Sequence, residues 1–354
     1  MRLFLGLGVF AGITVVANAS TLYNITDLGT LGGDSSVAFA VSANGQAAGW
    51  ATDTLGNTEA IVFGGAIPQN LGAGQATGIN SSGQVSGIVS SGGATHGVVW
   101  SGNSVLDFGA NTSAAAINDA GQVAGSANHA FIYENGTATD LGTLAGGSWS
   151  LAEGLSDNGD IAGYGDSAGG IRGFVWVPGE GLEELGALGG GSSYGMAVND
   201  AGQAVGSAAV STGYLHAAEW AGGPATDLGT LGGNNSYAYG INNAGIIVGY
   251  SWTAGNTATH GFVVINGVMV DLNSLLSASG SGWVITAAYG INDQGQIVGE
   301  ALYDGVSHAV LLNDPPADLS FTAPGFAAPE PATLALGGLS LLLLAGRFLL
   351  SRRS

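Results

Sequence analysis

The sequence predicts an all-β protein, and within that class a seven-bladed β-propeller of four-stranded repeats. Two observations favour this fold: a nine-residue string recurs seven times, and Gly-rich turns separate short apolar runs throughout the body of the chain. The clearest copy runs from Ile291 to Gly299 and reads Ile-Asn-Asp-Gln-Gly-Gln-Ile-Val-Gly. The other copies begin at Val41, Ile79, Ile117, Leu155, Val198 and Ile241. Because a unit of about 40 residues cannot bury a core alone, the copies must pack into one domain.

The third unit shows the expected strands most clearly. They are Val105–Gly109, Ser113–Ile117, Gln122–Gly125 and Ala130–Tyr133. Asn135 and Gly136 then form a pair that is typical of tight hairpin turns, and the next unit is expected to begin at Thr139. Four short strands in about 40 residues are typical of a propeller blade. An open β-solenoid is the alternative architecture.

A ring of blades needs a strand that closes it. Tyr23–Gly29 has the pattern of an Asp-Leu-Gly strand but has no unit before it, so we expect it to complete the last blade. The last unit favours this expectation, because its own fourth strand is poorly defined after Leu312. Ala317–Ser320 is a degenerate copy of the same strand and could compete for this place.

The Asn-Asp-x-Gly segment of the string predicts a hairpin turn. Asn or Asp can bond to the backbone two residues on, and Gly supplies the positive φ that closes the turn. This glycine is present in every copy, as Gly45, Gly83, Gly121, Gly159, Gly202, Gly245 and Gly295. Asp157–Asp160 also looks faintly like a calcium loop, but it lacks the spacing and the terminal Glu of an EF-hand. We therefore expect structural turns and no cofactor, with calcium as a weak alternative.

All histidines of the chain occupy one position of the repeat. They are His96, His129, His216, His260 and His308. Glu59 and Arg172 stand at this position in the other two units. A ring of metal ligands or of titrating groups is one interpretation, but a metal site gathers three or four ligands in one small volume. Equivalent positions of different blades usually lie far apart, so we expect each His to bond a neighbouring backbone group or Asp.

The charge of the chain excludes one class of partner. The chain has no Lys and five Arg, and residues 20–328 carry 24 acidic residues against the single Arg172, a net charge of −23. Nucleic-acid binding depends on Lys and Arg that neutralise phosphates. We therefore expect no nucleic-acid partner, and a surface that attracts cations instead.

Residues 1–19 have the features of a signal peptide. Arg2 precedes an apolar run, and Ala17 and Ala19 form the small-residue cleavage site. The run is short for a bilayer span of about 20 residues, so cleavage is expected. The repeat body then covers residues 20–314 and a linker covers 315–328. The chain is expected to begin and end in short hydrophobic helices.

The segment 329–354 combines three features in order. Pro329, Glu330 and Pro331 come first, an apolar span follows, and Arg347, Arg352 and Arg353 make a basic end. In this order the segment resembles the PEP-CTERM sorting signal of Gram-negative bacteria. The resemblance implies transient anchoring in the inner membrane, cleavage by an exosortase, and delivery of the body to the cell surface or the extracellular matrix. A plain single-span anchor is the alternative.

The repeat itself also resembles a known family. Asp-Leu-Gly-Thr-Leu-Gly-Gly occurs at 27–33 and 227–233, Ile-Asn-x-x-Gly-Gln recurs in the string, and His129-Ala130-Phe131 follows a string. These motifs resemble the HAF-type extracellular repeat over roughly residues 22–312. The resemblance implies an exported bacterial protein and no particular reaction.

The sequence favours a non-enzymatic surface or matrix protein that binds polysaccharide or another protein. No zinc-protease motif or P-loop is present. The alternative is a hydrolase or lyase of extracellular polysaccharide with its site at the axis. Acidic residues that converge on the axis would favour the enzyme, and small residues there would favour the binding module. Among the tryptophans, Trp100, Trp176 and Trp220 are expected in the core, and Trp149 and Trp252 are candidates for ligand contact.

Overall fold

The computed structural model describes residues 22–64 and 68–313. The expected signal peptide, linker and sorting segment, with Ala17, Ala19, Pro329, Glu330, Pro331 and the three terminal arginines, lie outside these residues. The two terminal helices and Ala317–Ser320 lie outside them as well. Within the described residues, no helix has both the length and the apolar character needed to cross a membrane.

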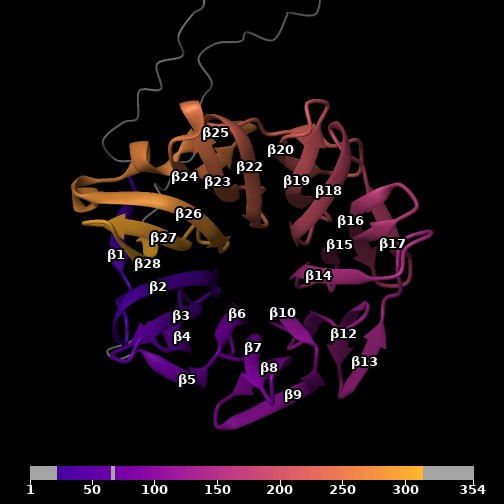
Figure 1. The fold of residues 1–354 in the computed structure, drawn as a ribbon, viewed down its shortest axis with the longest axis horizontal. Helices are drawn as coiled ribbons and strands as arrows, with labels where there is room; N and C mark the ends of the chain where they lie inside the picture. Colours follow the sequence, from indigo (N-terminus) through magenta and orange to yellow (C-terminus); the bar gives the residue numbers. More distant parts are fainter. Residues whose placement is uncertain (1–21, 65–67, 314–354) are drawn as a thin grey trace, which may run out of the picture. The chain divides into compact units, whose positions relative to one another are not determined.

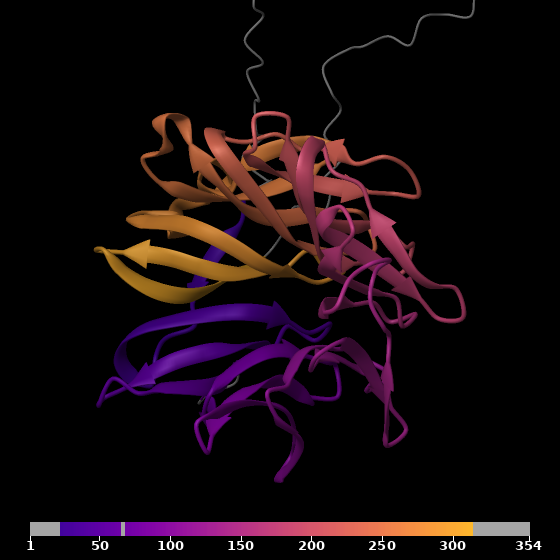
Figure 2. The ribbon, with the colours of Figure 1, turned by 45° about the vertical axis from the view of Figure 1, so that its right-hand side comes forward.

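The described residues form an all-β propeller. Their 28 strands make seven four-stranded antiparallel sheets, arranged as blades around a common axis (Figure 1). The first sheet follows the last in the ring: β2 of blade 1 lies beside β27 and β28 of blade 7 (Figures 1 and 2). The predicted seven-bladed propeller is confirmed, and the alternative of an open solenoid is wrong.

The strands of each blade run from the innermost to the outermost. Blade 1 contains β2 (Gly32–Val41), β3 (Ala47–Asp53), β4 (Thr58–Phe63) and β5 (Gln69–Ala73). Blade 2 contains β6 (Gln75–Ile79), β7 (Val85–Ser91), β8 (Ala94–Ser101) and β9 (Ser104–Ala110). Blade 3 contains β10 (Ser113–Ile117), β11 (Val123–Ser126), β12 (Ala130–Glu134) and β13 (Thr137–Asp140). Blade 4 contains β14 (Ser150–Leu155), β15 (Ile161–Ser167), β16 (Gly170–Val177) and β17 (Gly181–Leu185).

The remaining blades follow the same order. Blade 5 contains β18 (Gly189–Val198), β19 (Ala204–Val210), β20 (Leu215–Trp220) and β21 (Thr226–Asp227). Blade 6 contains β22 (Gly232–Ile241), β23 (Ile247–Thr253), β24 (Thr259–Ile265) and β25 (Val268–Asp271). Blade 7 contains β26 (Trp283–Ile291), β27 (Ile297–Tyr303), β28 (Val306–Asn313) and the distant β1 (Asn24–Asp27). The short 3-10 helices η1 (Ala254–Asn256), η2 (Leu272–Leu275) and η3 (Ala278–Gly280) lie in the connections.

The predicted strands of the third unit all form, but the phase of the unit differs from the prediction. Val105–Gly109 lies in β9, which is the outer strand of blade 2 and does not open blade 3. Likewise, Thr139 lies in β13, at the outer edge of blade 3, and does not begin the next unit. The reason is that the string joins the two innermost strands, so each blade begins just before its string.

The predicted closing strand is confirmed. Strand β1 pairs antiparallel with β28, with Ile25 opposite Leu312 and Asp27 opposite Val310. The Tyr23 backbone N–H donates to the Leu275 carbonyl at 2.8 Å, and the Tyr23 side chain is buried. The first and last parts of the repeat body therefore share one sheet, which holds the ring closed.

The glycine at the end of the string is needed for close packing of the two inner strands. A Cβ added at Gly206 would lie 1.9 Å from the Tyr194 carbonyl oxygen, and one at Gly49 would lie 1.9 Å from the Val37 carbonyl oxygen. No side chain fits at such a distance, so this glycine is fixed by the approach of β-strand backbones.

The hydrophobic core lies between neighbouring blades. One cluster combines Val205 and Ala217 of blade 5 with Ile247 and Phe262 of blade 6, and all four are buried. Small residues on one blade thus pack against large residues on the next, which matches the close packing of protein interiors. Because each core is shared, no blade can be removed without exposing the faces of two others.

Candidate functional site

The seven copies of the string meet at one end of the propeller axis. Residues from all seven hairpins line a hollow of about 240 Å³ there. The turn glycine has a φ between 72° and 89° in every copy, at Gly45, Gly83, Gly121, Gly159, Gly202, Gly245 and Gly295. The predicted turns are confirmed, and the hollow is therefore bordered by turn backbone and the side chains that project from it.

Every junction between blades carries a hydrogen bond from an Asn side-chain amide to a backbone carbonyl of the next blade. Asn199 Nδ2 donates to the Asn242 carbonyl at 3.1 Å, and Asn242 Nδ2 donates to the Asn292 carbonyl at 3.1 Å. Asn292 Nδ2 donates to the Ser42 carbonyl at 2.9 Å and so closes the ring. Asn80 and Asn118 make the equivalent bonds from blades 2 and 3.

Blades 1 and 4 have Ser in place of this Asn and make the bond from a different residue. Asn44 Nδ2 donates to the Ser81 carbonyl at 3.2 Å, and Asn158 Nδ2 donates to the Asp200 carbonyl at 2.8 Å. In both blades the Asn lies two residues after the Ser. Sequence reasoning assigned the Asn only to its own turn, a role it also has, since Asn199 Oδ1 accepts from the Ala201 N–H.

Acidic side chains of the string converge on the same end of the axis, but they bond the backbone. Asp157 Oδ1 accepts from the Asp119 N–H at 2.9 Å, and Asp200 Oδ1 accepts from the Asp157 N–H at 2.9 Å. Asp293 Oδ1 accepts from the Asn243 N–H at 2.8 Å. Burial raises the pKa of Asp157, and the charges of Asp119, Asp200 and Asp293 raise it further. Within the described residues, no group of three or more His, Asp or Glu is placed to hold a metal ion, so the calcium alternative gains no support.

Each histidine bonds an Asp, which is one of the partners that the sequence predicted. Each bonds through Nδ1 to the Asp of the adjacent outer strand, at 2.9 Å for His96 and Asp107 and at 2.6 Å for His260 and Asp271. The other pairs are His129 with Asp140, His216 with Asp227, and His308 with Asp27 of the closing strand. In blade 4, Arg172 pairs with Glu184 at 3.2 Å instead. These pairs tie the third strand of a blade to its fourth.

One position of the inner strand differs from blade to blade, and it is always a β-bulge. The pairing register of each inner strand shifts around a single residue two positions before the strand ends. These bulge residues of blades 1 to 7 are Phe39, Thr77, Ala115, Glu153, Met196, Tyr239 and Tyr289. A bulge redirects the side chain of its extra residue and is common beside functional sites. The inner strands surround the axis (Figure 1), so the bulges lie on the strands nearest to it.

Aromatic side chains extend from the bulges of three neighbouring blades. The Tyr289 ring lies 5.4 Å from Phe39 and 5.4 Å from Tyr239, measured between ring centroids. Tyr239 stacks on Tyr250 at 5.7 Å with an interplanar angle of 18°, and Tyr237 lies 5.1 Å from Tyr250. These rings join blades 1, 6 and 7.

A second group of rings lies in blades 4 and 5. The ring centroid of Tyr164 lies 5.1 Å from that of Tyr194 and 6.1 Å from that of Trp149. Tyr194 lies on β18 and Tyr237 on β22, and these inner strands of blades 5 and 6 contact each other, so the two groups are neighbours. We call the eight residues of both groups the aromatic band: Phe39, Trp149, Tyr164, Tyr194, Tyr237, Tyr239, Tyr250 and Tyr289.

Two carboxyl groups lie beside the aromatic band. Glu153 is the bulge residue of blade 4, and burial raises its pKa to about 7, although a hydrogen bond from Tyr164 opposes the shift. Glu300 lies on β27 and lines a cavity of about 430 Å³ together with Tyr237, Tyr250, Trp252 and Tyr289. Carboxylates thus converge at the hairpin end of the axis, as expected for the enzyme, but they bond the backbone. The inner strands carry large aromatic residues as well as small ones.

The tryptophan predictions agree in part with the structure. Trp100 and Trp220 are buried, and Trp176 packs partly buried against the core of blades 3 and 4. Trp252 lines the cavity beside Glu300, and Trp149 belongs to the aromatic band. Both candidates for ligand contact are half-buried. The tyrosines were not predicted as site residues. A signal was present, because Tyr239 and Tyr289 occupy a position at which the repeats differ.

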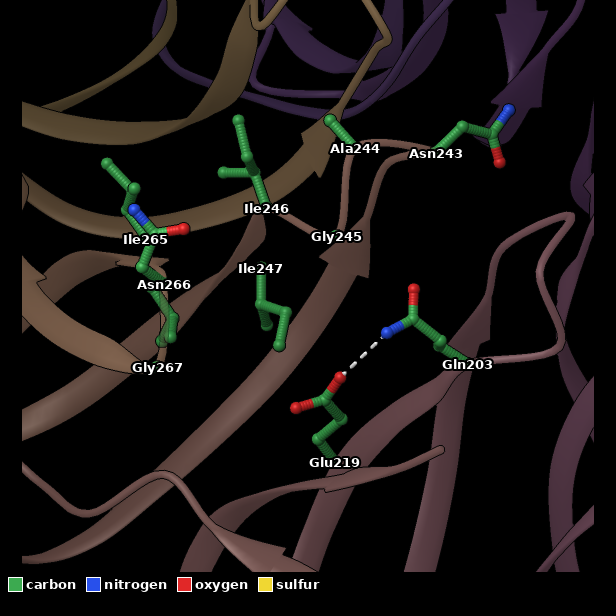
Figure 3. A pocket seen from close by; sticks show the side chains of 11 residues that line it. Gln203, Glu219, Asn243, Ala244, Gly245, Ile246, Ile247, Ile265, Asn266 and Gly267 are labelled. Carbon is green, nitrogen blue, oxygen red and sulfur yellow. Dashed lines mark hydrogen bonds between the residues drawn. The ribbon is translucent and has the colours of Figure 1, made fainter. Parts of the chain in front are cut away.

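A second pocket lies between blades 5 and 6 at the hairpin end (Figure 3). It measures about 450 Å³, and in it Gln203 Nε2 donates to Glu219 Oε1 at 3.1 Å. Its apolar wall includes Ile246, which stands where the other copies of the string have Gln or Asp. Since this pocket has no aromatic ring, we take the aromatic band as the candidate site.

No protein-family model and no curated protein matches this chain. It is similar to the β-propeller domain of the Trilobed protease from Pyrococcus furiosus, with 12% identity, a TM-score of 0.47, and coverage of 66% of this chain and 82% of that one. It is similar to YCF48 bound to D1 peptide, with 11% identity, a TM-score of 0.47, and coverage of 87% and 98%. A gluconolactonase from Xanthomonas campestris gives 13% identity, a TM-score of 0.42, and coverage of 83% and 92%. These likenesses concern the fold alone.

The amide bond between blades makes a first testable prediction. Asn199→Ala removes the bond to the Asn242 carbonyl and leaves that buried acceptor without its partner. We expect it to lower the free energy of unfolding by about 2 kcal/mol or more, measured by urea denaturation. Asn103→Ala, at an exposed turn, is the control and should change it by less than about 0.5 kcal/mol. Equal losses in the two variants would contradict the role of the amide ring.

The raised pKa of Glu153 makes a second prediction. The unfolded chain releases this proton near the ordinary pKa of 4.5, and the folded chain only near 7, so folding stability falls as pH rises through this window. Glu153→Gln should therefore stabilise the protein by about 3 kcal/mol at pH 8 and have little effect at pH 4. The measurement is thermal unfolding at both pH values. Glu183→Gln, on the exposed outer strand of blade 4, is the control, and a pH-independent effect of Glu153→Gln would contradict the shift.

Proposed function

We propose that the propeller is a non-enzymatic binding module for extracellular polysaccharide, which docks along the aromatic band. The aromatic band carries this proposal, because flat rings offer large contact surfaces at a low cost in side-chain entropy. Tyrosine adds a hydroxyl that can bond a sugar hydroxyl. Burial raises the pKa of Tyr289 to about 12, with the Glu300 charge as a second cause, so this hydroxyl keeps its proton at any ordinary pH.

The charge of the chain narrows the class of polysaccharide. The net charge of −23 over residues 20–328 opposes the approach of an anionic polymer. Glu153 and Glu300 beside the rings act in the same direction. A neutral or cationic polysaccharide therefore suits the aromatic band better than an acidic one.

One observation favours the enzymatic alternative, a polysaccharide hydrolase or lyase. Glu153 lies beside the axis with a pKa of about 7, and a general acid needs to hold its proton near the working pH. The opposing observation is that the carboxylates at the hairpin end accept hydrogen bonds from backbone amides, which is a structural role. We therefore keep the binding module as the main proposal.

We also propose that the protein is exported and reaches the cell surface or the extracellular matrix through exosortase processing. This proposal is supported by residues 1–19 and 329–354, whose patterns suit a cleaved signal peptide and a sorting segment. The membrane is then a transient partner, through the C-terminal segment before processing.

Variants of the aromatic band test the binding proposal. Tyr239→Ala and Tyr250→Ala should each weaken binding to the polysaccharides that the full chain selects on a glycan array by at least about tenfold, since each removes a stacking surface. Tyr214→Ala, an exposed tyrosine at a hairpin of blade 5, should bind like the unchanged protein. Identical array profiles for all variants would contradict the site. Release of new reducing ends, lost in Glu153→Gln, would instead establish the enzyme.

The sorting proposal has its own test. Glu330→Ala should block release of the propeller from the cell membrane, because it removes the charged centre of the Pro-Glu-Pro motif. The measurement is the fraction of the protein in the membrane and in the medium of an exosortase-bearing host. Asp318→Ala, in the expected linker, is the control. Unchanged release of Glu330→Ala would refute the exosortase proposal.

A further inference from the structure

The cavity beside Glu300 has the composition of a site for a positively charged group. Its walls include the aromatic side chains of Tyr237, Tyr250, Trp252 and Tyr289, and its volume is about 430 Å³. Tyr237 and Tyr250 lie 5.1 Å apart with their planes inclined by 40°, so their faces do not cover each other fully. An ammonium group within about 6 Å of such ring faces is attracted by their negative electrostatic potential.

The carboxylate of Glu300 has no cationic partner among the described residues. Its Oε1 accepts a short hydrogen bond from the Ser307 hydroxyl, which is neutral. Every ion pair in the described part of the chain involves either a His with an Asp or Arg172 with Glu184. Glu300 is half-buried. Burial raises the pKa of Tyr289 and the Glu300 charge raises it further, so the carboxylate acts on a ring of the same cavity. A ligand can therefore supply the positive charge that the protein does not.

The rest of the chain favours the same ligand. With no Lys and a single Arg between residues 20 and 328, the protein has almost no cation that could compete for this cavity. Its negative field also raises the local concentration of cations and speeds their approach. A neutral sugar gains nothing from these features, whereas a sugar that carries an amino group gains from each of them.

We infer that the polysaccharide bound by this protein carries free amino groups, and that the Glu300 cavity holds one of its ammonium groups. This inference rests on the proposed polysaccharide binding and specifies its ligand. The ammonium lies against the rings of Tyr237, Tyr250 and Tyr289 and donates to the free oxygen of Glu300. The adjoining sugar rings lie along the rest of the aromatic band.

The test compares two oligosaccharides that differ only in charge. A glucosamine hexamer is cationic at pH 6, and an N-acetylglucosamine hexamer is neutral. Binding to the full chain is measured by calorimetry. We expect the cationic hexamer to bind at least tenfold more tightly, and its affinity to fall with added salt while that of the neutral hexamer does not.

Variants separate the Glu300 cavity from the general negative charge. Glu300→Gln should weaken binding of the cationic hexamer about tenfold and leave the neutral hexamer unchanged. Glu183→Gln removes the same charge at the exposed outer edge of blade 4 and should have little effect. Thermal unfolding of both variants shows whether the fold is intact. If Glu300→Gln does not fold, Glu300→Asp replaces it as a second variant, which keeps the charge.

Each outcome has a separate meaning. Equal affinities for the two hexamers, or equal effects of Glu300→Gln and Glu183→Gln, would overturn the inference and leave polysaccharide binding standing. No binding of either hexamer, together with no dependence on Tyr239 or Tyr250 on the glycan array, would overturn both proposals. Glu300-dependent binding of tetralysine as tight as that of the cationic hexamer would show a general ammonium site and overturn the sugar specificity.

Discussion

The structure depends on one repeated hydrogen bond, from an Asn side-chain amide to a backbone carbonyl of the next blade. It occurs at all junctions of the described ring, and it persists where the usual Asn is Ser, because Asn44 and Asn158 then supply the amide. A hydrophobic interface alone resists separation but allows sliding, since burial is not directional. The amide bond is directional, and it sets the position of each hairpin against the next. This explains why all seven hairpins border one hollow.

The division between scaffold and site follows from this constraint. Positions with a fixed structural role, such as the Asn that bonds the next blade and the turn and final Gly of the string, serve the scaffold and differ little between blades. The bulge residue contacts no fixed partner in the ladder, so it is free to differ, and it changes from Thr77 and Ala115 on one side of the axis to Tyr239 and Tyr289 on the other. The aromatic band is therefore asymmetric in a nearly symmetric ring, which is what a specific ligand requires.

The sequence predicted the features that depend on local chemistry. Turn type, strand content, the closing strand and the His–Asp pairs follow from residue types at fixed spacings, and the structure agrees with each of them. The phase of the blade was wrong, because the sequence shows a period but not which strand is innermost. The second bond of Asn199 and the contacts between Tyr239 and Tyr289 could not be predicted, since both cross blade interfaces whose geometry only the closed ring defines.

The choice of neutral groups for the ring bonds has a consequence for how pH acts on the protein. Amide and carbonyl groups do not titrate, so the junctions between blades keep these bonds at any ordinary pH. The His–Asp pairs contain ionisable groups, but they join the third and fourth strands of one blade and lie at its outer edge. Glu153, by contrast, changes its charge near pH 7 and lies on an inner strand beside the aromatic band. A change of pH around neutrality therefore alters the charge beside the aromatic band, while the hydrogen bonds that join the blades do not change.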